Sequence, residues 1–547
     1  IQEGRSLFCG DYELFRLNAG ASRTSTKSEK TGYRIASVFG RVNYNYQMKY
    51  LLSLVARYDG ISRLKDNRWG FFPGVSVGWN VTEEDFWKES KISEVISNIK
   101  PRLSYGVNGN VNGIGNFDIY GIYKQIGAGN YDGATAYYNS SLINTGLRWE
   151  QSRSFEAGLD LGFFNNRLSF IFDYYNRTTD DLLTDVNLPA YTGFSSMKTN
   201  LGKLRNSGFE MEVRANILSN AKGFNWEVSA NLTSVSNKVL KLPTSDKPFN
   251  QIDGYEVAAG LYNPETGETP TKWIGGYREG GKLGDMVGYV QNHIFRDWND
   301  VKANANMVID EVANLYGPGM ANEINPQTGV TYAESNGWKP IEPGDVCWED
   351  INKDGKINSL DRAVVGNIFP KVTGGFSTTL SYKNWSLYAR FDYALGHTIY
   401  NDLKARSLGQ YQGQFNIIDK VHDTWSETNP DTDLPVFTYA DQLNKKNITR
   451  SNNGNTAVDN NSSRFYEKGD YLALREITLS YSLPKKWIGK AGMQDASVYV
   501  TGQNLFYITG YDGVSPEPAV STVYGRGIDN GRYPTPRTLL FGLSVTF

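Results

Sequence analysis

The last nine residues of the chain, Leu539-Leu540-Phe541-Gly542-Leu543-Ser544-Val545-Thr546-Phe547, form a pattern with two unlike faces. Side chains of a β-strand point alternately to opposite sides, so one face collects the large apolar residues Leu539, Phe541, Leu543, Val545 and Phe547. The small or polar residues Gly542, Ser544 and Thr546 share the other face. This pattern is typical of a lipid-facing barrel strand, although a half-buried strand of a soluble sheet also fits it.

The same alternation recurs in pairs of strands that are joined by tight turns. Residues 38–46 and 50–59 flank a short polar turn at Gln47–Lys49, and similar pairs surround Asn165-Asn166 and Lys383-Asn384. Asn-rich turns between alternating segments are a strong signal for β-hairpins. Strands of about ten residues also suit a tilted crossing of a bilayer. We therefore predict an all-β fold of roughly fourteen to sixteen antiparallel strands.

Composition favours a transmembrane barrel. Aromatic residues make up 13% of the chain, with 35 Tyr, and Gly occurs 56 times, yet the mean hydropathy is only -0.47. No run approaches the roughly 18 apolar residues that a membrane helix needs, so a membrane-spanning chain of this kind must use a closed barrel. The net charge of -2 and 21% charged residues give no sign of a nucleic-acid partner.

Loop lengths are unequal, and the inequality predicts an orientation. Short turns are expected at Gln47–Lys49, Asn165-Asn166, Ser219–Gly223, Gly280-Gly281 and Lys383-Asn384. Long excursions are expected at about 178–205, 296–370, 396–470 and 507–535, provided that a weak strand near Trp273–Arg278 is counted. Outer-membrane barrels keep short turns in the periplasm and long loops outside the cell. If the last strand ends in the periplasm, each of these long loops is extracellular.

Several ordered motifs carry a family resemblance that extends over nearly the whole chain. Together they resemble the C-terminal half of SusC/RagA-like TonB-dependent transporters. The matching segments are Arg57-Tyr58-Asp59-Gly60-Ile61-Ser62-Arg63, Arg68-Trp69-Gly70-Phe71-Phe72-Pro73, Ser104-Tyr105-Gly106-Val107-Asn108-Gly109-Asn110, Asp173-Tyr174-Tyr175-Asn176, Asn206-Ser207-Gly208-Phe209-Glu210, Thr373-Gly374-Gly375-Phe376, Gly502-Gln503-Asn504-Leu505-Phe506 and Tyr533-Pro534-Thr535-Pro536-Arg537.

The resemblance implies an importer in the outer membrane of a Gram-negative, Bacteroidetes-like bacterium. Such a transporter looks like a barrel of about 22 strands with an N-terminal plug. The implied partners are a SusD-like surface lipoprotein, TonB and the lipid of the outer membrane, and the implied substrates are oligosaccharides or oligopeptides. The TonB box, the plug and the first strands have no counterpart here. Residues 1–547 are therefore expected to be the C-terminal part of the barrel, completed by an N-terminal plug and barrel segment.

One segment of the 296–370 loop has the spacing of a calcium-binding loop. Residues 350–361 read Asp-Ile-Asn-Lys-Asp-Gly-Lys-Ile-Asn-Ser-Leu-Asp. A twelve-residue calcium loop places oxygen donors at positions one, three, five, seven, nine and twelve, with Gly at six. The candidate ligands are Asp350, Asn352, Asp354, the Lys356 carbonyl, Asn358 and Asp361. Asp361 reaches less far than the usual Glu, and a turn without an ion would use the same residue types.

Two other features of the long loops are predicted from residue type. Residues 298–316 have the apolar spacing of an amphipathic helix that packs on the barrel rim or on a partner. Aromatic residues in the 396–470 loop are candidates for stacking on sugar rings or peptide side chains, while most other Tyr and Trp are expected in the interfacial girdles. The candidate substrate-binding residues are Tyr411, Phe415, Phe437 and Tyr439.

Catalysis is not expected. Gly74-Val75-Ser76-Val77-Gly78 matches the GxSxG pattern of hydrolases, but it lies in an alternating strand, whereas a nucleophile elbow needs a turn from strand to helix. The chain has only three His, and Cys9 and Cys347 do not form a paired motif.

Two other classes of function fit parts of the pattern. A passive, porin-like channel would close by itself and conduct without an energy source. A surface glycan-binding β protein would turn its alternating apolar faces inward and remain in solution without detergent.

Overall fold

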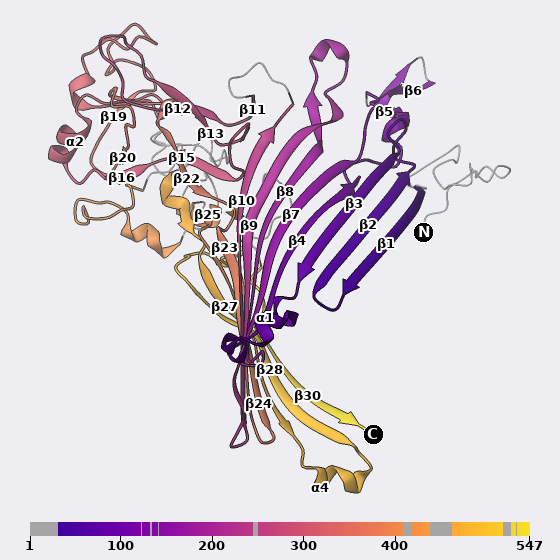
Figure 1. Cartoon of the computed structure of the whole chain (residues 1–547). Coiled ribbons are helices and arrows are strands. Elements are labelled where there is room, and N and C mark those ends of the chain that lie inside the picture. Colours follow the sequence, from indigo (N-terminus) through magenta and orange to yellow (C-terminus); the bar gives the residue numbers. More distant parts are fainter. Residues whose placement is uncertain are drawn as a thin grey trace.

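The computed structural model describes residues 31–121, 123–131, 134–139, 142–243, 250–405, 407–408, 418–437, 462–517, 527–531 and 533–547. In this part of the chain, thirteen strands form one continuous antiparallel sheet, which sweeps through the molecule from β1 to β30 (Figure 1). Its strands, in spatial order, are β1 (Ile35–Tyr46), β2 (Tyr50–Ile61), β3 (Trp69–Trp79), β4 (Ile96–Asn110), β7 (Glu150–Phe163), β8 (Leu168–Asn187), β9 (Ser196–Ala221), β10 (Phe224–Lys241), β23 (Val372–Tyr382), β24 (Trp385–Leu395), β27 (Tyr471–Ser482), β28 (Asp495–Thr509) and β30 (Thr538–Thr546). The predicted antiparallel all-β architecture is confirmed, and β1 and β30 are the two edges of the sheet.

Short turns and long excursions lie at opposite ends of the sheet. Because every neighbouring pair is antiparallel, the turns at 47–49, 164–167, 222–223 and 383–384 share one end, which we call the turn end. The excursions at 111–149, 242–371, 396–470 and 510–537 all leave from the other end, which we call the loop end. In Figure 1 the hairpin β5 (Tyr123–Tyr131) and β6 (Ala134–Asn139) lies toward the loop end. Helix α4 (Lys485–Ile488) lies at the turn end.

The strand prediction was wrong in two places. The weak strand expected near Trp273–Arg278 is two short pieces outside the main sheet, because Gly275 and Gly276 both take positive φ, of 67° and 56°, and break the extended chain. The turn at Gly280-Gly281 is therefore part of one long excursion. The loop expected at 178–205 is mostly strand, since β8 and β9 stay paired as far as Asn187 and Ser196.

Neighbouring rows of residues across the sheet differ in polarity. One cross-strand row contains Leu380, Leu387, Leu479, Val500 and Phe541. In this row Phe541 is 81% exposed and Leu479 41%. The adjacent row, on the other face, contains Thr379, Tyr388, Thr478 and Thr501, and the hydroxyls of Thr478 and Thr501 lie 2.8 Å apart. An apolar face left exposed beside a hydrogen-bonded polar face fits contact with lipid on one side and water on the other.

The polar face also carries paired charges. Arg102 of β4 binds Asp160 of β7 at 2.9 Å and Asp173 of β8 at 2.7 Å. Toward β1, the row Asn43, Ser53, Ser76, Ser104 and Glu156 runs across five strands on the same face.

Aromatic side chains gather at the turn end. The rings of Tyr46, Tyr50 and Trp79 stack in sequence, with centroids 6.4 and 6.5 Å apart. The carboxylate of Glu84 accepts hydrogen bonds from the Tyr50 hydroxyl at 2.7 Å and the Trp79 indole at 3.1 Å, and it pairs with Lys49 at 3.1 Å. Glu84 directly precedes α1 (Asp85–Lys88). Such amphipathic rings suit the border between lipid and water.

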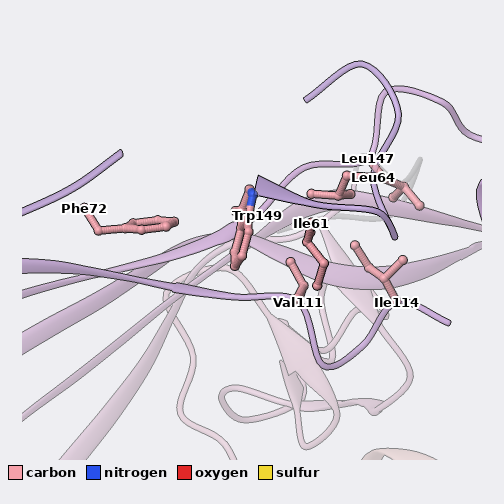
Figure 2. Packing of buried hydrophobic residues seen from close by; sticks show 7 residues of the cluster. All are labelled: Ile61, Leu64, Phe72, Val111, Ile114, Leu147 and Trp149. Atoms are coloured by element: carbon pink, nitrogen blue, oxygen red, sulfur yellow. The ribbon is translucent and has the colours of Figure 1, made fainter. Parts of the chain in front are cut away.

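A small apolar core ties three connections together at the loop end. Trp149, just before β7, meets Phe72 of β3 edge-on at 5.3 Å and donates its indole N–H to the Arg68 carbonyl at 3.0 Å. Figure 2 shows Trp149 between Phe72 and a group of aliphatic side chains. The cluster consists of Ile61, Leu64, Phe72, Val111, Ile114, Leu147 and Trp149. It fixes the β2–β3 connection against the segments that follow β4 and precede β7.

The 242–371 excursion forms a packed region at the loop end (Figure 1), and it shares a buried cluster with residues of the 396–470 connection. Its strands are β11 (Gln251–Ile252), β12 (Tyr255–Ala258), β13 (Thr271–Ile274), β14 (Tyr277–Arg278), β15 (Asp285–Tyr289), β16 (Gln291–Ile294), β17 (Ile309–Asp310), β18 (Leu315–Tyr316), β19 (Lys339–Pro340), β20 (Val346–Trp348), β21 (Lys356–Ile357) and β22 (Arg362–Asn367). The short strands β17, β18, β19 and β21 pair into one four-stranded sheet, beside which the buried clusters of this region pack. The predicted loop at 296–370 lies within this longer excursion.

The helix in this region is shorter than predicted. Helix α2 spans Trp298–Ala305 and begins where the Asp297 side chain accepts hydrogen bonds from the next turn. The helix predicted to reach Tyr316 is wrong after Ala305, because the chain there enters the short strands β17 and β18. Among the described residues, no helix is long and apolar enough to cross a membrane.

The remaining short elements lie in the 396–470 and 510–537 connections. They are β25 (Thr398–Asn401), α3 (Asp402–Ala405), β26 (Tyr466–Lys468) and β29 (Ile528–Asp529), and β25 pairs with both β26 and β29. The β25–β29 pairing joins two excursions that are far apart in the sequence.

Candidate functional site

The predicted calcium loop is folded as a tight turn whose carboxylates accept hydrogen bonds from its own backbone. Asp350 accepts from the amides of Lys353 at 2.7 Å and Gly355 at 2.9 Å. Asp361 accepts from the amides of Ile351 at 2.9 Å and Asn358 at 2.8 Å. Gly355, at position six, has φ +79°. The sequence spacing therefore produces a sharp, closed loop.

Asn352 and Asp361 are buried in this loop, with 0% and 1% of their surfaces exposed. Asn352 attaches the loop to the β12–β13 hairpin, because its side-chain amide donates to Thr269 at 2.9 Å and its carbonyl accepts from the Tyr262 amide at 2.7 Å. Within the described residues, no three His, Cys, Asp or Glu side chains are gathered closely enough to hold a metal ion. Coordination would therefore require the carboxylates to turn from the backbone amides toward one point.

The electrostatics of the loop favour a cation. Burial raises the pKa of Asp361 to about 6, and the neighbouring Asp350 and Asp354 also act to raise it. A bound calcium ion would compensate the desolvation and the repulsion among the carboxylates. The oxygen donors suit calcium, and the residues present fit this ion by chemistry.

Of the four aromatic residues predicted to bind substrate, only Phe437 lies within the described residues. Tyr411, Phe415 and Tyr439 lie outside the described residues. Phe437 is half-buried beside Val436, whose amide donates to the Gly344 carbonyl at 2.8 Å. Gly74–Gly78 lie inside β3 and not at a turn from strand to helix.

A polar cavity of about 730 Å³ lies where three excursions meet at the loop end. Its lining comes from β16, from the 396–470 connection and from the segment that follows β28. The cationic lining residues are Lys404, Arg464 and Lys468. The acidic ones are Asp433, Glu467, Asp470 and Asp512.

Ion pairs hold one side of this cavity together. The Lys404 ammonium lies 2.9 Å from Glu467 and 3.1 Å from Asp512. Burial opposes the charge on Lys404, but its hydrogen bonds to the two carboxylates hold its pKa above the usual value. The Arg464 guanidinium lies 2.9 Å from a carboxylate oxygen of Asp433, and this hydrogen bond holds the pKa of Asp433 below its ordinary value. These contacts bring α3, β26 and the segment after β28 to one wall.

A second ion-pair group fixes the segment after β28 to the sheet. Arg475 sits at a β-bulge of β27, where the register shifts against both β24 and β28. Its guanidinium binds Asp392 at 2.6 Å, the Tyr507 hydroxyl at 3.0 Å and the carboxylate of Glu517. A bulge re-aims the extra side chain, here onto the polar face beside Asp392. Arg475 thus holds the 511–517 segment against the loop end of the sheet.

Our sequence reasoning missed this charged cavity. In the sequence, the cavity was indicated only by the alternating charges of Arg464, Glu467, Lys468 and Asp470, which directly precede β27. The other charges come from positions far away in the sequence, and only the pairing of β25 with β26 and β29 brings them close.

Comparison with known proteins decides the family. The model of the family described as "TonB dependent receptor-like, beta-barrel" matches residues 5–278, which is half of the chain. The chain belongs to the TonB-dependent receptor β-barrel family. It is 30% identical to TonB-dependent receptor P3 of Formosa agariphila over 99% of this chain and 48% of that protein. It is also 30% identical to TonB-dependent receptor SusC of Bacteroides thetaiotaomicron, over 95% of this chain and 45% of that protein.

Solved structures show the same fold for this TonB-dependent receptor chain. It superposes on a structure titled "Structure of the RagAB peptide transporter" with a TM-score of 0.68 and 23% identity, covering 98% of this chain and 50% of the other. The predicted resemblance to SusC/RagA-like proteins is confirmed, as is the outer-membrane location of the protein. The chain spans about half the length of the relatives that it matches.

Proposed function

We propose that this chain is the C-terminal barrel portion of a TonB-dependent importer that takes up oligosaccharides or oligopeptides across the outer membrane. The observation that carries the proposal is the thirteen-stranded sheet, whose exposed apolar face, polar opposite face and one-sided long excursions agree with the family match. The named relatives are TonB-dependent receptors along nearly the whole of this chain. The RagAB structures, described as a peptide transporter, share its fold.

In the proposed mechanism, solute is captured at the loop end and passes along the polar face. The excursions form the outer surface, and the charged cavity of about 730 Å³ lies among them. A polar interior lets hydrated solutes cross a membrane that would otherwise exclude them. We assign the plug and the coupling to TonB to an N-terminal segment, where energy would enter the cycle.

A SusD-like surface lipoprotein is the proposed partner at the loop end. The likeness to SusC and to the RagAB transporter supports it. The large packed region formed by 242–371 supplies an outer surface for such a lid, with exposed apolar side chains that include Leu261, Trp298, Met307 and Ile324.

Uptake by cells tests the proposed function. Cells that carry the full-length gene should accumulate labelled oligopeptides or oligosaccharides, and deletion of TonB should abolish this accumulation. Deletion of the gene itself serves as the control for other uptake routes. Accumulation that persists without TonB would instead show a passive, porin-like channel.

We also propose that residues 350–361 bind calcium in the loop-end region. The ligands would be Asp350, Asn352, Asp354, the Lys356 carbonyl, Asn358 and Asp361. The buried position of Asp361 among other carboxylates and the sharp turn at Gly355 support this proposal. Calcium would order the loop and its contact with the β12–β13 hairpin, and it would supply no chemistry to transport.

A further inference from the structure

The charged cavity at the loop end contains both paired and free charges. On one wall, Lys404 is paired with Glu467 and Asp512, and Arg464 is paired with Asp433. These cations are therefore largely neutralised by carboxylates of the protein. Lys468 is exposed and has no ion-pair or hydrogen-bond partner among the described residues. Asp470 accepts one hydrogen bond, from the Gly396 amide to Oδ1 at 2.5 Å, and leaves its second oxygen free within the described chain. A free cation and a free anion thus stand two residues apart on the same rim.

Deeper in the wall, another donor has no partner. The Arg464 side chain is only 16% exposed, and its Nη1 atom contacts Asp433. Its Nε atom is buried and makes no hydrogen bond in the described structure. A buried N–H group without an acceptor is unfavourable by itself, so a rearrangement that exposed it to the cavity would let a ligand oxygen satisfy it.

The described lining is poorly complementary to several kinds of ligand. None of the eleven described lining residues is aromatic, so this part of the lining offers no ring face for stacking on a neutral sugar. A polyanion would meet four carboxylates, and a polycation would meet three basic side chains, so neither is complementary. Complementarity requires a ligand that carries both signs of charge and also amide-like donors and acceptors.

We infer that this cavity binds a zwitterionic peptide segment, with a peptide carboxylate facing Lys468 and Arg464 and a peptide ammonium facing Asp470. The inference rests on the proposed import function and names its substrate class as oligopeptide. The peptide backbone supplies donors and acceptors for the polar lining. Charge pairing at the rim also makes the affinity dependent on ionic strength.

Binding to the full-length transporter, purified in detergent together with whatever lipoprotein accompanies it, tests the inference. The first probe is a synthetic heptapeptide of glycine and serine with free termini, one lysine and one glutamate. The second is the same peptide with blocked termini and glutamine at both charged positions, and the third is a neutral linear glucose heptamer. We expect only the first probe to bind measurably, with affinity that falls about tenfold or more as salt rises from about 0.05 M to about 0.5 M.

Two variants localise the binding. Lys468→Gln and Asp470→Asn should each weaken binding of the charged peptide by about fivefold, because each removes one rim charge. Asp470→Asn keeps an oxygen for the Gly396 amide, so the fold at this position is preserved. Lys339→Gln, at an exposed lysine of β19 outside the cavity, is the matched control and should leave binding unchanged.

The outcomes separate this inference from the import function. Equal binding of the neutral glycan, or peptide binding that ignores both rim variants, would overturn the inference even if uptake still requires TonB. Charge-dependent peptide binding that both variants weaken would support the cavity assignment even if uptake proves independent of TonB. In that second case only the energised import would fail.

Discussion

Gly355 shows how one residue type makes the calcium-type loop possible. Its φ of +79° lies in the left-handed region, which costs other residues about 1–2 kcal/mol. A Cβ atom built at this position would have its nearest neighbour, the Met307 carbonyl oxygen, at 3.4 Å. The constraint at Gly355 is therefore mainly conformational and only slightly steric.

Replacing Gly355 with alanine should destabilise the loop by about 1–2 kcal/mol, because the backbone must keep its left-handed conformation. The destabilisation should appear as faster amide hydrogen exchange across residues 350–361 in the alanine variant. Gly489→Ala is the matched control, since Gly489 has φ -62° and no atom within 4 Å of an added Cβ. Equal exchange in the two variants would show that the loop does not depend on the left-handed conformation of Gly355.

Asp350 offers the direct residue-scale test of calcium binding. Calcium should slow proteolysis within 350–361, because coordination would replace several weak contacts with one ordered centre. Asp350→Asn keeps a side-chain oxygen for the backbone amides but removes a ligand charge, so it should weaken calcium binding about tenfold. Proteolysis that calcium leaves unchanged in the native chain would refute the site.

Asp361 adds a pH dependence to the same experiment. Its pKa of about 6 in the ion-free loop means that it is protonated below this pH, and calcium requires the carboxylate. Calcium should therefore protect the loop more weakly at pH 5 than at pH 7. The ion-free loop should itself lose stability as the pH rises from about 4 to about 6, because the raised pKa favours the protonated folded form.

At the scale of elements, alternation along single strands decides which side meets lipid. In β27, Ile477 lies on the apolar face beside Ala389, while Thr478 lies on the polar face and bonds Thr501. The bulge at Arg475 then moves one charged side chain onto the polar face without disturbing the strand below it. A shift of one residue would reverse every one of these placements.

Ile477→Arg should block assembly or destabilise the barrel by about 2–4 kcal/mol, because it puts a charge into the lipid region. Thr478→Arg, one residue along the same strand, should be tolerated because its side chain enters the polar interior. The yield of folded, heat-modifiable protein in outer membranes measures both. Similar yields of the two variants would show that the apolar face does not contact lipid.

The contacts of Arg475 predict how the 511–517 segment responds to substitution. Arg475→Met leaves Asp392 and Glu517 without their cation and should loosen the 511–517 segment by about 3 kcal/mol. Hydrogen exchange in residues 511–517 should rise, while exchange in β1 and β2 should stay unchanged. Arg475→Lys retains the charge but not the branched donors, so its effect should be intermediate. Unchanged exchange in the methionine variant would contradict the anchoring role.

Local periodicity was enough to predict the sheet but not the packing of its excursions. The hairpins at Asn165-Asn166 and Lys383-Asn384 follow from turn chemistry and alternation, and Asn165, Asn166 and Lys383 take positive φ values. The region 242–371 has strands of two to six residues, which are too short to show a period. The charged cavity depends on contacts between residues such as Lys404 and Asp512, which no local pattern joins.

At the scale of the whole molecule, the features that we connect with transport lie in order from the turn end of the sheet to its loop end. Tight turns occupy one end, the polar face runs between, and the packed excursions with the cavity and the calcium-type loop occupy the other end. This division lets solute capture vary by loop chemistry while the strands keep one membrane-spanning design. In our account, the chain acts together with a plug segment and a surface lipoprotein.

Purification of the full-length protein from native outer membranes, followed by intact mass measurement and planar-bilayer recording, tests this account most directly. We predict a complex that contains a plug-bearing N-terminal segment and a surface lipoprotein, and that conducts no steady ionic current. Recovery of this chain alone as a closed, conducting pore would contradict the importer and establish a passive channel.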